Sequence, residues 1–213
     1  MLSLVFQFLC NIFALLLLVF QGNVGIVTIV LAVLIRLLIW PGYQKAIISQ
    51  RKLSRIQPQI KKIQDKYQDD PVKANQEVLA LFKKEKVSFS SIFFIFLQSA
   101  ILILCFFFFR SIIQTDWSRY LYSFVPTLPA LNYFFLGINL KLPSLLLALI
   151  SAGINSVTVM LQPSQGQNKA LYLFLPFAIL LFYKRIPAII LLFWVITGII
   201  GLVQDYKLSR KKL

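Results

Sequence analysis

Long apolar runs separated by short polar segments are the main pattern of this chain. A helix needs about 20 residues, with a range of about 17–25, to cross the hydrocarbon core of a bilayer. Besides an apolar N-terminal stretch, five runs approach or reach that length. We predict that they are the five transmembrane helices of an all-α polytopic membrane protein, at residues 23–41, 89–109, 142–161, 170–183 and 187–204.

The N-terminal stretch, residues 1–20, is apolar but has no basic residues at its start and no small-residue cleavage pattern. Secretory signals carry both features. The segment before Cys10 is also too short for a lipoprotein signal, so we expect neither cleavage nor lipid attachment. The stretch is either a further span or an amphipathic helix lying on the outer leaflet.

Residues 43–88 interrupt the apolar pattern and predict a helical hairpin. The first arm, 43–68, is compatible with a helix that bends or breaks at Pro58. Asp69-Asp70-Pro71 indicates a stop and a restart, with Asp70 as the N-cap and Pro71 in the first turn of the second arm. That arm, 72–86, is amphipathic, with these apolar residues on one side: Val78, Leu79, Leu81 and Phe82.

The charge of the chain is concentrated in this hairpin. The 213 residues include 22 Lys and Arg against 7 Asp and Glu, a formal net charge of +15, and 11 of the basic residues lie within 43–88. Basic loops stay on the cytoplasmic side of a membrane. Placing 43–88, 162–169 and 207–213 inside puts 16 basic residues there and leaves 5 outside. We therefore predict an outer N-terminus and a cytoplasmic C-terminus.

The same assignment places a loop at 110–141 outside and a tail at 205–213 inside. The outer loop is rich in aromatic residues, which favour the membrane interface. The cytoplasmic tail is basic, so it is suited to contact anionic lipid or a ribosome.

Composition excludes several classes of protein. Hydrophobic residues make up 59% of the chain and its mean hydropathy is +0.79, which is more apolar than a soluble domain. The sequence has no histidine, no acidic pair within a span and no nucleophile set beside a base. We therefore expect no enzyme activity, no cofactor and no metal. Cys10 and Cys105 lie in separate apolar runs and are interpreted as core or lipid-facing residues.

Arg36 is the candidate functional residue that the pattern singles out first. It lies in the apolar run that opens at Val24 and closes at Pro41, where an arginine costs about 3 kcal/mol on insertion scales. Its side chain either snorkels to the headgroups near Pro41, about 7.5 Å along the helix, or faces a hydrated groove. No acidic residue lies within the spans except Asp205 at a cytoplasmic end, so a buried Arg36 requires water or an acidic ligand.

Polar residues share helix faces in several of the predicted spans. Helical spacing aligns Thr28 with Arg36 in the first span and places Asn155 and Thr158 on one face of the third. The second span contains Gln98. The last span has a face with Trp194, Thr197, Gly198, Gly201, Gln204 and Asp205. Such residues either hold helices together, which we prefer for Gly198 and Gly201, or line a hydrated groove.

Two stretches resemble a known family. GNVGIVTIVLAVLIRLLIWP combines a Gly-Asn start, an arginine in a span and a proline exit. It is followed by LSRIQPQIKKIQDKYQDDPVKANQEVLALFKKEKV, with its Gln-Pro arm and Asp-Asp-Pro turn. In this order they resemble the YidC/Oxa/Alb membrane protein insertases. Weaker matches extend the resemblance over nearly the whole chain: FIFLQSAI, FFLGINLKLPS, YLFLPFAILLF and IPAIILLFWVITGIIGLVQDY.

The resemblance implies five spans with the N-terminus outside and residues 1–20 as an outer-leaflet amphipathic helix. It also implies a multi-pass protein of the bacterial plasma membrane that inserts nascent membrane proteins and helps them fold. A groove open to the cytoplasm and the lipid bilayer would contain Arg36, Gln98 and Trp194, and the polar faces add Thr28, Asn155 and Thr158. The cytoplasmic hairpin would capture substrates with these residues: Lys61, Lys62, Asp69, Asp70 and Pro71.

Further partners follow from the same reading. A ribosome, reached through the basic tail and the cytoplasmic loops, and a Sec translocon are candidates, and DNA is not expected. The alternative is a small transporter or channel subunit that uses the polar faces to pass an ion or solute. It predicts a pore open to both sides and an inverted repeat, and the sequence contains no convincing repeat.

Overall fold

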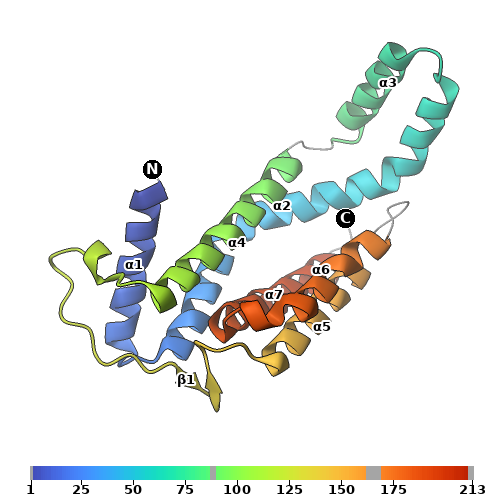
Figure 1. The fold of residues 1–213 in the computed structure, drawn as a ribbon. Coiled ribbons are helices and arrows are strands. Elements are labelled where there is room, and N and C mark those ends of the chain that lie inside the picture. The colour runs from blue at the N-terminus through green and yellow to red at the C-terminus, as the bar shows by residue number, and fades with distance from the viewer. Residues whose placement is uncertain (1, 87–89, 162–168, 211–213) are drawn as a thin grey trace.

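The computed structural model of the chain describes residues 2–86, 90–161 and 169–210. They form a bundle of helices from which a helical hairpin projects (Figure 1). The prediction of a helical protein is confirmed. The elements are α1 (Leu2–Val19), α2 (Val24–Lys66), α3 (Pro71–Lys84), α4 (Ser90–Gln114), η1 (Ser118–Tyr120), β1 (Phe134–Phe135), β2 (Ile138–Asn139), α5 (Leu145–Leu161), α6 (Lys169–Phe182), η2 (Tyr183–Arg185) and α7 (Ala188–Arg210).

Two of the described helices are long and apolar enough to cross a membrane, within Val24–Lys66 and Ala188–Leu208. Shorter apolar helical segments are Leu4–Val19, Ala100–Gln114 and Leu145–Thr158. Length and composition alone define these candidates, so the number of spans and their orientation stay predictions.

α2 is one continuous helix where the sequence predicts two elements. It passes through Pro41, the predicted end of the first span, and through Pro58. A proline inside a helix removes a backbone hydrogen bond and usually kinks or ends the helix. After Pro41 the helix is supported by tertiary packing, because Tyr43 and Ile47 are buried together with Leu208 of α7. At 1.5 Å per residue the helix is about 65 Å long, and it links the bundle to the hairpin.

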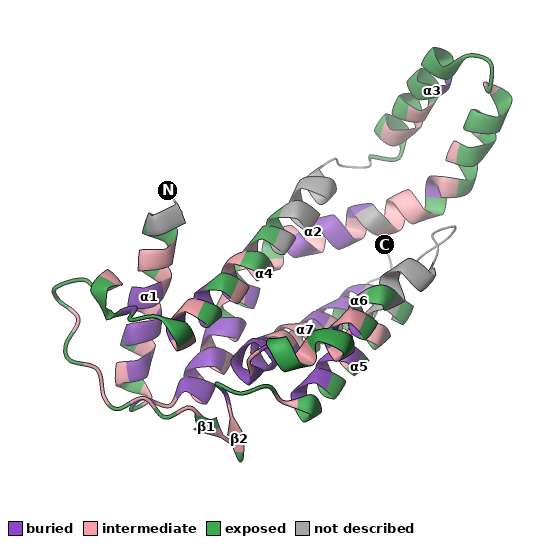
Figure 2. Ribbon diagram, in the orientation of Figure 1, coloured by how far each residue is buried: buried purple, intermediate pink, exposed green. Residues whose placement is uncertain are grey.

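The core of the bundle lies around α2, α4 and α7. α2 packs against both α4 and α7, and α7 also packs against α5, which in turn packs against α6. Figure 2 shows that buried residues gather in this bundle, whereas the hairpin is exposed over most of its length. Fully buried aromatic side chains are prominent in the core: Phe13, Phe108, Phe109 and Phe193. Cys10 and Cys105 are both core residues with free thiols.

α1 packs against α4 and against the loop that follows α4. The ring of Phe13 meets the ring of Trp117 edge to face, with centroids 5.9 Å apart. Asn11 donates a hydrogen bond to the carbonyl oxygen of Tyr120 at 3.0 Å and accepts one from the backbone N–H of Tyr122 at 2.8 Å. The exposed side of α1 is also apolar, with Leu4, Val5, Phe8, Leu15 and Val19. Asn11 thus faces the protein, and the exposed apolar surface of α1 suits lipid; a place for α1 on the outer leaflet stays a prediction.

The loop between α4 and α5 is fastened to the start of α2. Asn23 caps α2, and its Oδ1 accepts a hydrogen bond from the N–H of Ile26 at 3.0 Å. On either side of this cap, the backbone N–H of Asn132 donates to the carbonyl oxygen of Gly22 at 2.9 Å, and its backbone carbonyl accepts from the N–H of Val24 at 3.1 Å. The Gly-Asn start of the first apolar run thus has a structural role, because it anchors the loop.

β1 and β2 form a short antiparallel hairpin that the sequence analysis does not predict. Leu136 and Gly137 join the strands with positive φ angles of 49° and 79°, which is the geometry of a tight two-residue hairpin turn. The ring of Phe135 lies against Gly25 of α2. The hairpin therefore covers the end of the bundle at which α2 begins.

We expect Gly22→Ala to lower the thermal unfolding midpoint clearly more than Gly137→Ala. Both glycines have positive φ, 80° and 79°, so both substitutions introduce the same backbone strain, of about 1 kcal/mol or more. Only at Gly22 would the added methyl group collide with the backbone, at the carbonyl oxygen of Ala130. Overpacking of this kind costs about 1–3 kcal/mol more. Unfolding in detergent, followed by tryptophan fluorescence, measures the difference, and equal midpoints would contradict it.

α3 folds back along the far end of α2 and completes the predicted helical hairpin. Asp70 is the N-cap of α3, with its Oδ1 accepting a hydrogen bond from the N–H of Lys73 at 3.0 Å, and Pro71 begins the helix. Both features are as predicted. Ile56 of α2 and Ala74 of α3 are buried in the hairpin, whereas most of its other described residues are half-buried or exposed.

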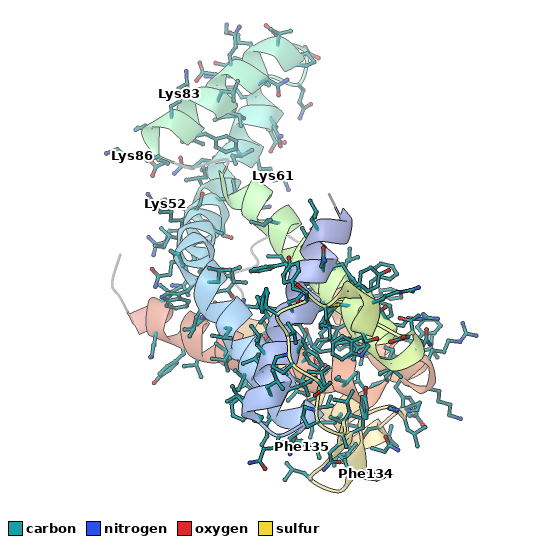
Figure 3. The ribbon with its side chains drawn as sticks, turned by 90° about the vertical axis from the view of Figure 1, so that its left-hand side faces the viewer. Lys52, Lys61, Lys83, Lys86, Phe134 and Phe135 are labelled. Atoms are coloured by element: carbon teal, nitrogen blue, oxygen red, sulfur yellow. The ribbon has the colours of Figure 1, made fainter. Side chains whose placement is uncertain are left out.

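Several lysines of the helical hairpin and two phenylalanines of the β-hairpin lie at opposite ends of the molecule. Figure 3 shows Lys52, Lys61, Lys83 and Lys86 along the hairpin, and Phe134 and Phe135 on the β-hairpin at the other end. This arrangement follows from the topology, since α2 starts beside the β-hairpin and ends in the lysine-rich helical hairpin.

Candidate functional site

Arg36 is buried where α2 packs against α7. The residue is only 7% exposed. Its Nε donates a hydrogen bond to the carbonyl oxygen of Thr197 at 3.2 Å, and its guanidinium lies directly against Gly201. This burial against α7 argues against an Arg36 that extends along the helix surface to lipid headgroups.

Tyr43 stacks against the guanidinium of Arg36. The two residues are seven positions apart on α2, or about two turns, so both face α7. The Cζ atom of Arg36 is 4.7 Å from the centroid of the Tyr43 ring, which is within the range of a cation–π interaction. The hydroxyl group of Tyr43 donates a hydrogen bond to Oδ1 of Asp205 at 2.8 Å. Tyr43 therefore contacts a cation with its ring and a carboxylate with its hydroxyl group.

Arg51 extends this contact between α2 and α7 toward the hairpin. Its Nη1 donates to the carbonyl oxygen of Leu208 at 2.9 Å, and its Nη2 donates to the carbonyl oxygen of Asp205 at 3.4 Å. The last carbonyls of a helix have no intrahelical partners and carry partial negative charge, so a basic side chain there is favourable. Arg36, Tyr43 and Arg51 together hold one face of α2 against the second half of α7.

The guanidinium of Arg36 has no carboxylate partner in the described part of the chain. Its contacts there are the Thr197 carbonyl, the Tyr43 ring and Gly201. Arginine carries five N–H donors; among the described residues its Nε bonds to the Thr197 carbonyl, and the guanidinium is also within hydrogen-bonding reach of the Tyr43 hydroxyl group. The site is therefore a buried cation without a carboxylate partner in the described part, which leaves N–H donors available to an acidic ligand.

Two buried polar atoms lack a hydrogen-bond partner among the described residues, Oγ of Ser151 on α5 and Oε1 of Gln204 on α7. Helical spacing places Gln204 on the same face as Gly201, toward α2. Buried polar atoms in native proteins are almost always hydrogen-bonded to protein or water. The surroundings of α7 thus contain hydrogen-bonding atoms that the described side chains do not pair.

Three further residues that were predicted to line the groove make side-chain hydrogen bonds within their own helices. Thr28 is fully buried, and its hydroxyl group donates to a backbone carbonyl one turn earlier at 2.8 Å. Asn155 and Thr158 donate in the same way, at 2.8 and 2.9 Å. These two residues are half-buried on α5, whose main neighbours are α6 and α7. None of the three hydrogen bonds reaches Arg36.

The other two predicted groove residues have different outcomes. Trp194 is half-buried on α7 and packs against the core of the bundle. Gln98 belongs to α4, but its side chain lies outside the described residues. A place for Gln98 beside Arg36 therefore stays a prediction.

Gly198 and Gly201 have separate roles on α7. A Cβ atom at Gly198 would lie 2.6 Å from Cγ2 of Ile154 on α5, so this glycine permits close helix packing, as predicted. A Cβ atom at Gly201 would instead collide with Nη2 of Arg36. Gly201 thus provides the space in which the guanidinium lies.

The residues predicted to capture substrates are far from Arg36. Lys61 and Lys62 at the end of α2, Asp69 and Asp70 in the turn, and Pro71 are all exposed. From Arg36 to Lys61, α2 rises by about 38 Å at 1.5 Å per residue. The hairpin and the buried cation are therefore separate sites that one helix connects.

Sequence reasoning missed the pairing of Tyr43 with Asp205. The spacing of seven between Arg36 and Tyr43 was a usable signal, but a helix predicted to end at Pro41 conceals it. Asp205 was placed correctly on a shared face with Gly201, one turn away. What the sequence lacks is any indication that this face of α7 meets α2.

Comparison with known proteins identifies relatives over nearly the whole chain. The profile of the family described as 60Kd inner membrane protein matches residues 16–213. The chain is 28% identical over 198 residues to a membrane protein insertase YidC of Prosthecochloris aestuarii, covering 90% of this chain and 34% of that protein.

Two other relatives carry the same name. The protein of Oleidesulfovibrio alaskensis is 26% identical over 200 residues, and that of Rickettsia bellii is 26% identical over 211 residues. Each match covers 90% of this chain and 36% of the relative. The chain thus spans about a third of the length of the curated relatives it matches.

Proposed function

We propose that this chain, which belongs to the 60Kd inner membrane protein family, inserts proteins into the bacterial plasma membrane and helps them fold. Its relatives are named membrane protein insertases. The observation that carries the proposal is the buried guanidinium of Arg36, which has no carboxylate partner among the described residues. A cation in this state attracts an acidic segment of a substrate, and it needs no bond-making chemistry to do so.

The polarity of the molecule supports a cytoplasmic hairpin and an outer N-terminus. Lysines lie along the hairpin, and the aromatic β-hairpin is at the opposite end (Figure 3). Basic segments stay on the cytoplasmic side, and aromatic side chains favour the membrane interface. In this orientation five spans cross the bilayer, with α1 near the outer leaflet and the basic tail inside.

Arg36 acts in a hydrated groove that opens to the cytoplasm and to lipid. Two unit charges 4 Å apart attract by about 4 kcal/mol at an effective dielectric constant of 20. This attraction offsets part of the cost of moving an acidic tail into the bilayer. Ser151 and Gln204, each with a buried polar atom lacking a partner in the described part, support a wet environment around α7.

The apolar segment of the substrate supplies the net driving force. Each leucine, isoleucine or phenylalanine at the centre of a membrane helix contributes about −0.3 to −0.6 kcal/mol. Once Arg36 has drawn the acidic tail inward, the apolar segment moves sideways into lipid and the tail is released on the outer side. The groove residues Thr28, Gln98, Asn155, Thr158 and Trp194 line this route in the proposal.

The exposed hairpin makes the first contact with the substrate. Lys61 and Lys62 give it positive charge, and Val72 and Leu79 are exposed apolar residues on α3. Such a mixed surface suits a nascent segment that is apolar and flanked by acidic residues. The basic tail and loops would approach a ribosome in the same geometry, and a Sec translocon is a further candidate partner.

Purified chain in proteoliposomes tests the proposal. The substrate is a single-span protein whose translocated tail carries two acidic residues, and insertion is measured by protease protection of that tail. We expect protection well above that in protein-free liposomes of the same lipid. Background protection with the wild-type chain would contradict the proposal. Solute flux through the same vesicles would then favour the transporter or channel alternative.

A further inference from the structure

We propose that Tyr43 is a positioning residue that keeps Asp205 from pairing with Arg36, so that the guanidinium stays available for a substrate carboxylate. This inference rests on the proposed function and specifies how its central cation is kept ready. Tyr43 lies between the two charges, with its ring on Arg36 and its hydroxyl group on Asp205.

Asp205 is close enough to be a competing partner. The guanidinium of Arg36 lies against Gly201, and Asp205 is four residues further along α7, about 6 Å along the helix axis. Both residues are more than nine-tenths buried, at 7% and 9% exposed. The two charges therefore lie on neighbouring turns of one partly dehydrated contact, where opposite charges attract each other more strongly than in water. A direct pair, in which the carboxylate accepts from both arms of the guanidinium, would be the strong alternative.

The structure has Tyr43 in the place of that pair. The hydroxyl group of Tyr43 occupies Oδ1 of Asp205 at 2.8 Å, and the ring covers one face of the guanidinium at 4.7 Å. Arg51 donates to the backbone carbonyl of Asp205 and not to its carboxylate. The charged or titratable groups around Asp205 are therefore Tyr43, Arg36 and Arg51, and among them only Tyr43 bonds to the carboxylate in the described part.

This arrangement has two consequences for function. Asp205 stays near enough to lower the cost of burying Arg36, since a buried cation without any counter-charge is strongly destabilising. At the same time the carboxylate does not cap the guanidinium, so an acidic substrate residue has no internal ion pair to break. Tyr43 thus lets Asp205 act as a nearby counter-charge for Arg36 without forming a direct ion pair with it.

Tyr43→Phe is the direct test, because it keeps the ring and removes only the hydroxyl group. We expect insertion of an acidic-tailed substrate to fall by about tenfold, within the range of ordinary site-to-site coupling. Insertion of a substrate with a neutral tail should change little. Adding Asp205→Asn to Tyr43→Phe should restore insertion of the acidic-tailed substrate to within about threefold of the wild type.

The rescue separates this role from a structural one. If the hydroxyl group merely tied α2 to α7, the double variant would be at least as impaired as Tyr43→Phe. That result, or full activity of Tyr43→Phe, would overturn the inference. Asp205→Asn alone keeps Tyr43 in place but removes the counter-charge, so its unfolding midpoint should fall, and insertion by every variant is therefore compared per amount of folded protein.

A second measurement does not depend on insertion. Phenylglyoxal modifies arginine side chains whose Nη groups are accessible and unpaired, and peptide mass spectrometry reports its reaction at Arg36. We expect Tyr43→Phe to slow this reaction and the double variant to restore it. Unchanged reactivity in Tyr43→Phe would overturn the inference even where the wild type inserts normally. A wild type that fails to insert would instead reject the proposed function.

Discussion

Arg36→Ala should reduce insertion of a substrate with two acidic residues in its tail by about a hundredfold, and Arg36→Lys should retain most of it. The reduction is the expected loss of the attraction between the guanidinium and the tail. A charge pair is worth about 4 kcal/mol at 4 Å and an effective dielectric constant of 20. If about 2.7 kcal/mol of this is realised in the rate-limiting step, the rate changes by two powers of ten. Protease protection in proteoliposomes measures the effect.

Tail charge provides the internal control for this prediction. A substrate with a neutral tail has nothing for Arg36 to attract, so Arg36→Ala should change its insertion by less than about threefold. Arg36→Glu should be worse than Arg36→Ala for the acidic tail, because attraction becomes repulsion. Equal protection in wild type, Arg36→Ala and Arg36→Lys would contradict the electrostatic mechanism and would mean that Arg36 has a structural or hydrating role.

Folding of the Arg36→Ala variant is not expected to fail. Removal of a buried charge eliminates its desolvation cost as well as its contacts, here one hydrogen bond to Thr197 and the stacking on Tyr43. The unfolding midpoint in detergent should therefore stay close to that of the wild type. A large drop would mean that the contacts of Arg36 between α2 and α7 outweigh its desolvation cost, and insertion by Arg36→Ala would then be compared with Arg36→Lys instead of the wild type.

Local chemistry explains what the sequence predicts well here. An arginine in an apolar run is costly wherever the helix lies, so Arg36 could be singled out without knowledge of its neighbours. The cap formed by Asp70 and the helix start at Pro71 depend on four consecutive residues and are confirmed. The length of the apolar runs likewise predicted the helical architecture, because a membrane span requires only enough consecutive apolar residues.

Contacts between distant segments explain what the sequence did not predict. Arg36 and Thr197 are 161 positions apart, and Tyr43 and Asp205 are 162 positions apart. Local propensity at Pro41 favours a helix end, yet packing of Tyr43 against Leu208 supports the next turn. The predicted end at Pro41 concealed Tyr43 from the candidate site, since a residue beyond a helix end has no fixed face.

The polar face of α5 shows what helical spacing alone does not predict. Asn155 and Thr158 share a face, as their spacing requires, but both donate to carbonyl groups of their own helix. Spacing identifies residues that can point together and cannot identify what they point at. Their place in the groove therefore depends on the geometry of a loaded state and remains a proposal.

Gly201→Ala is the substitution that should move the cation without removing it. The added methyl group would occupy the position of Nη2 of Arg36, and the guanidinium is the flexible end of its side chain, so it can shift. Displacement costs the hydrogen bond to Thr197 and the alignment with Tyr43. We expect insertion of the acidic-tailed substrate to fall by about tenfold or more, within the range of site coupling. Insertion of the neutral-tailed substrate and the unfolding midpoint should change little.

Two other helical glycines make this prediction specific. A methyl group added at Gly153 on α5 would meet no atom of the described residues within 4 Å, so Gly153→Ala should leave insertion of both substrates unchanged and should not lower the unfolding midpoint. Gly198→Ala would press against Ile154, and its cost should appear in the unfolding midpoint and affect acidic and neutral tails alike. Only Gly201→Ala should change the ratio of acidic-tail to neutral-tail insertion. An equally strong change of that ratio in Gly198→Ala would contradict this prediction. That result would show that helix packing around α7, and not the position of the guanidinium, determines the preference for acidic tails.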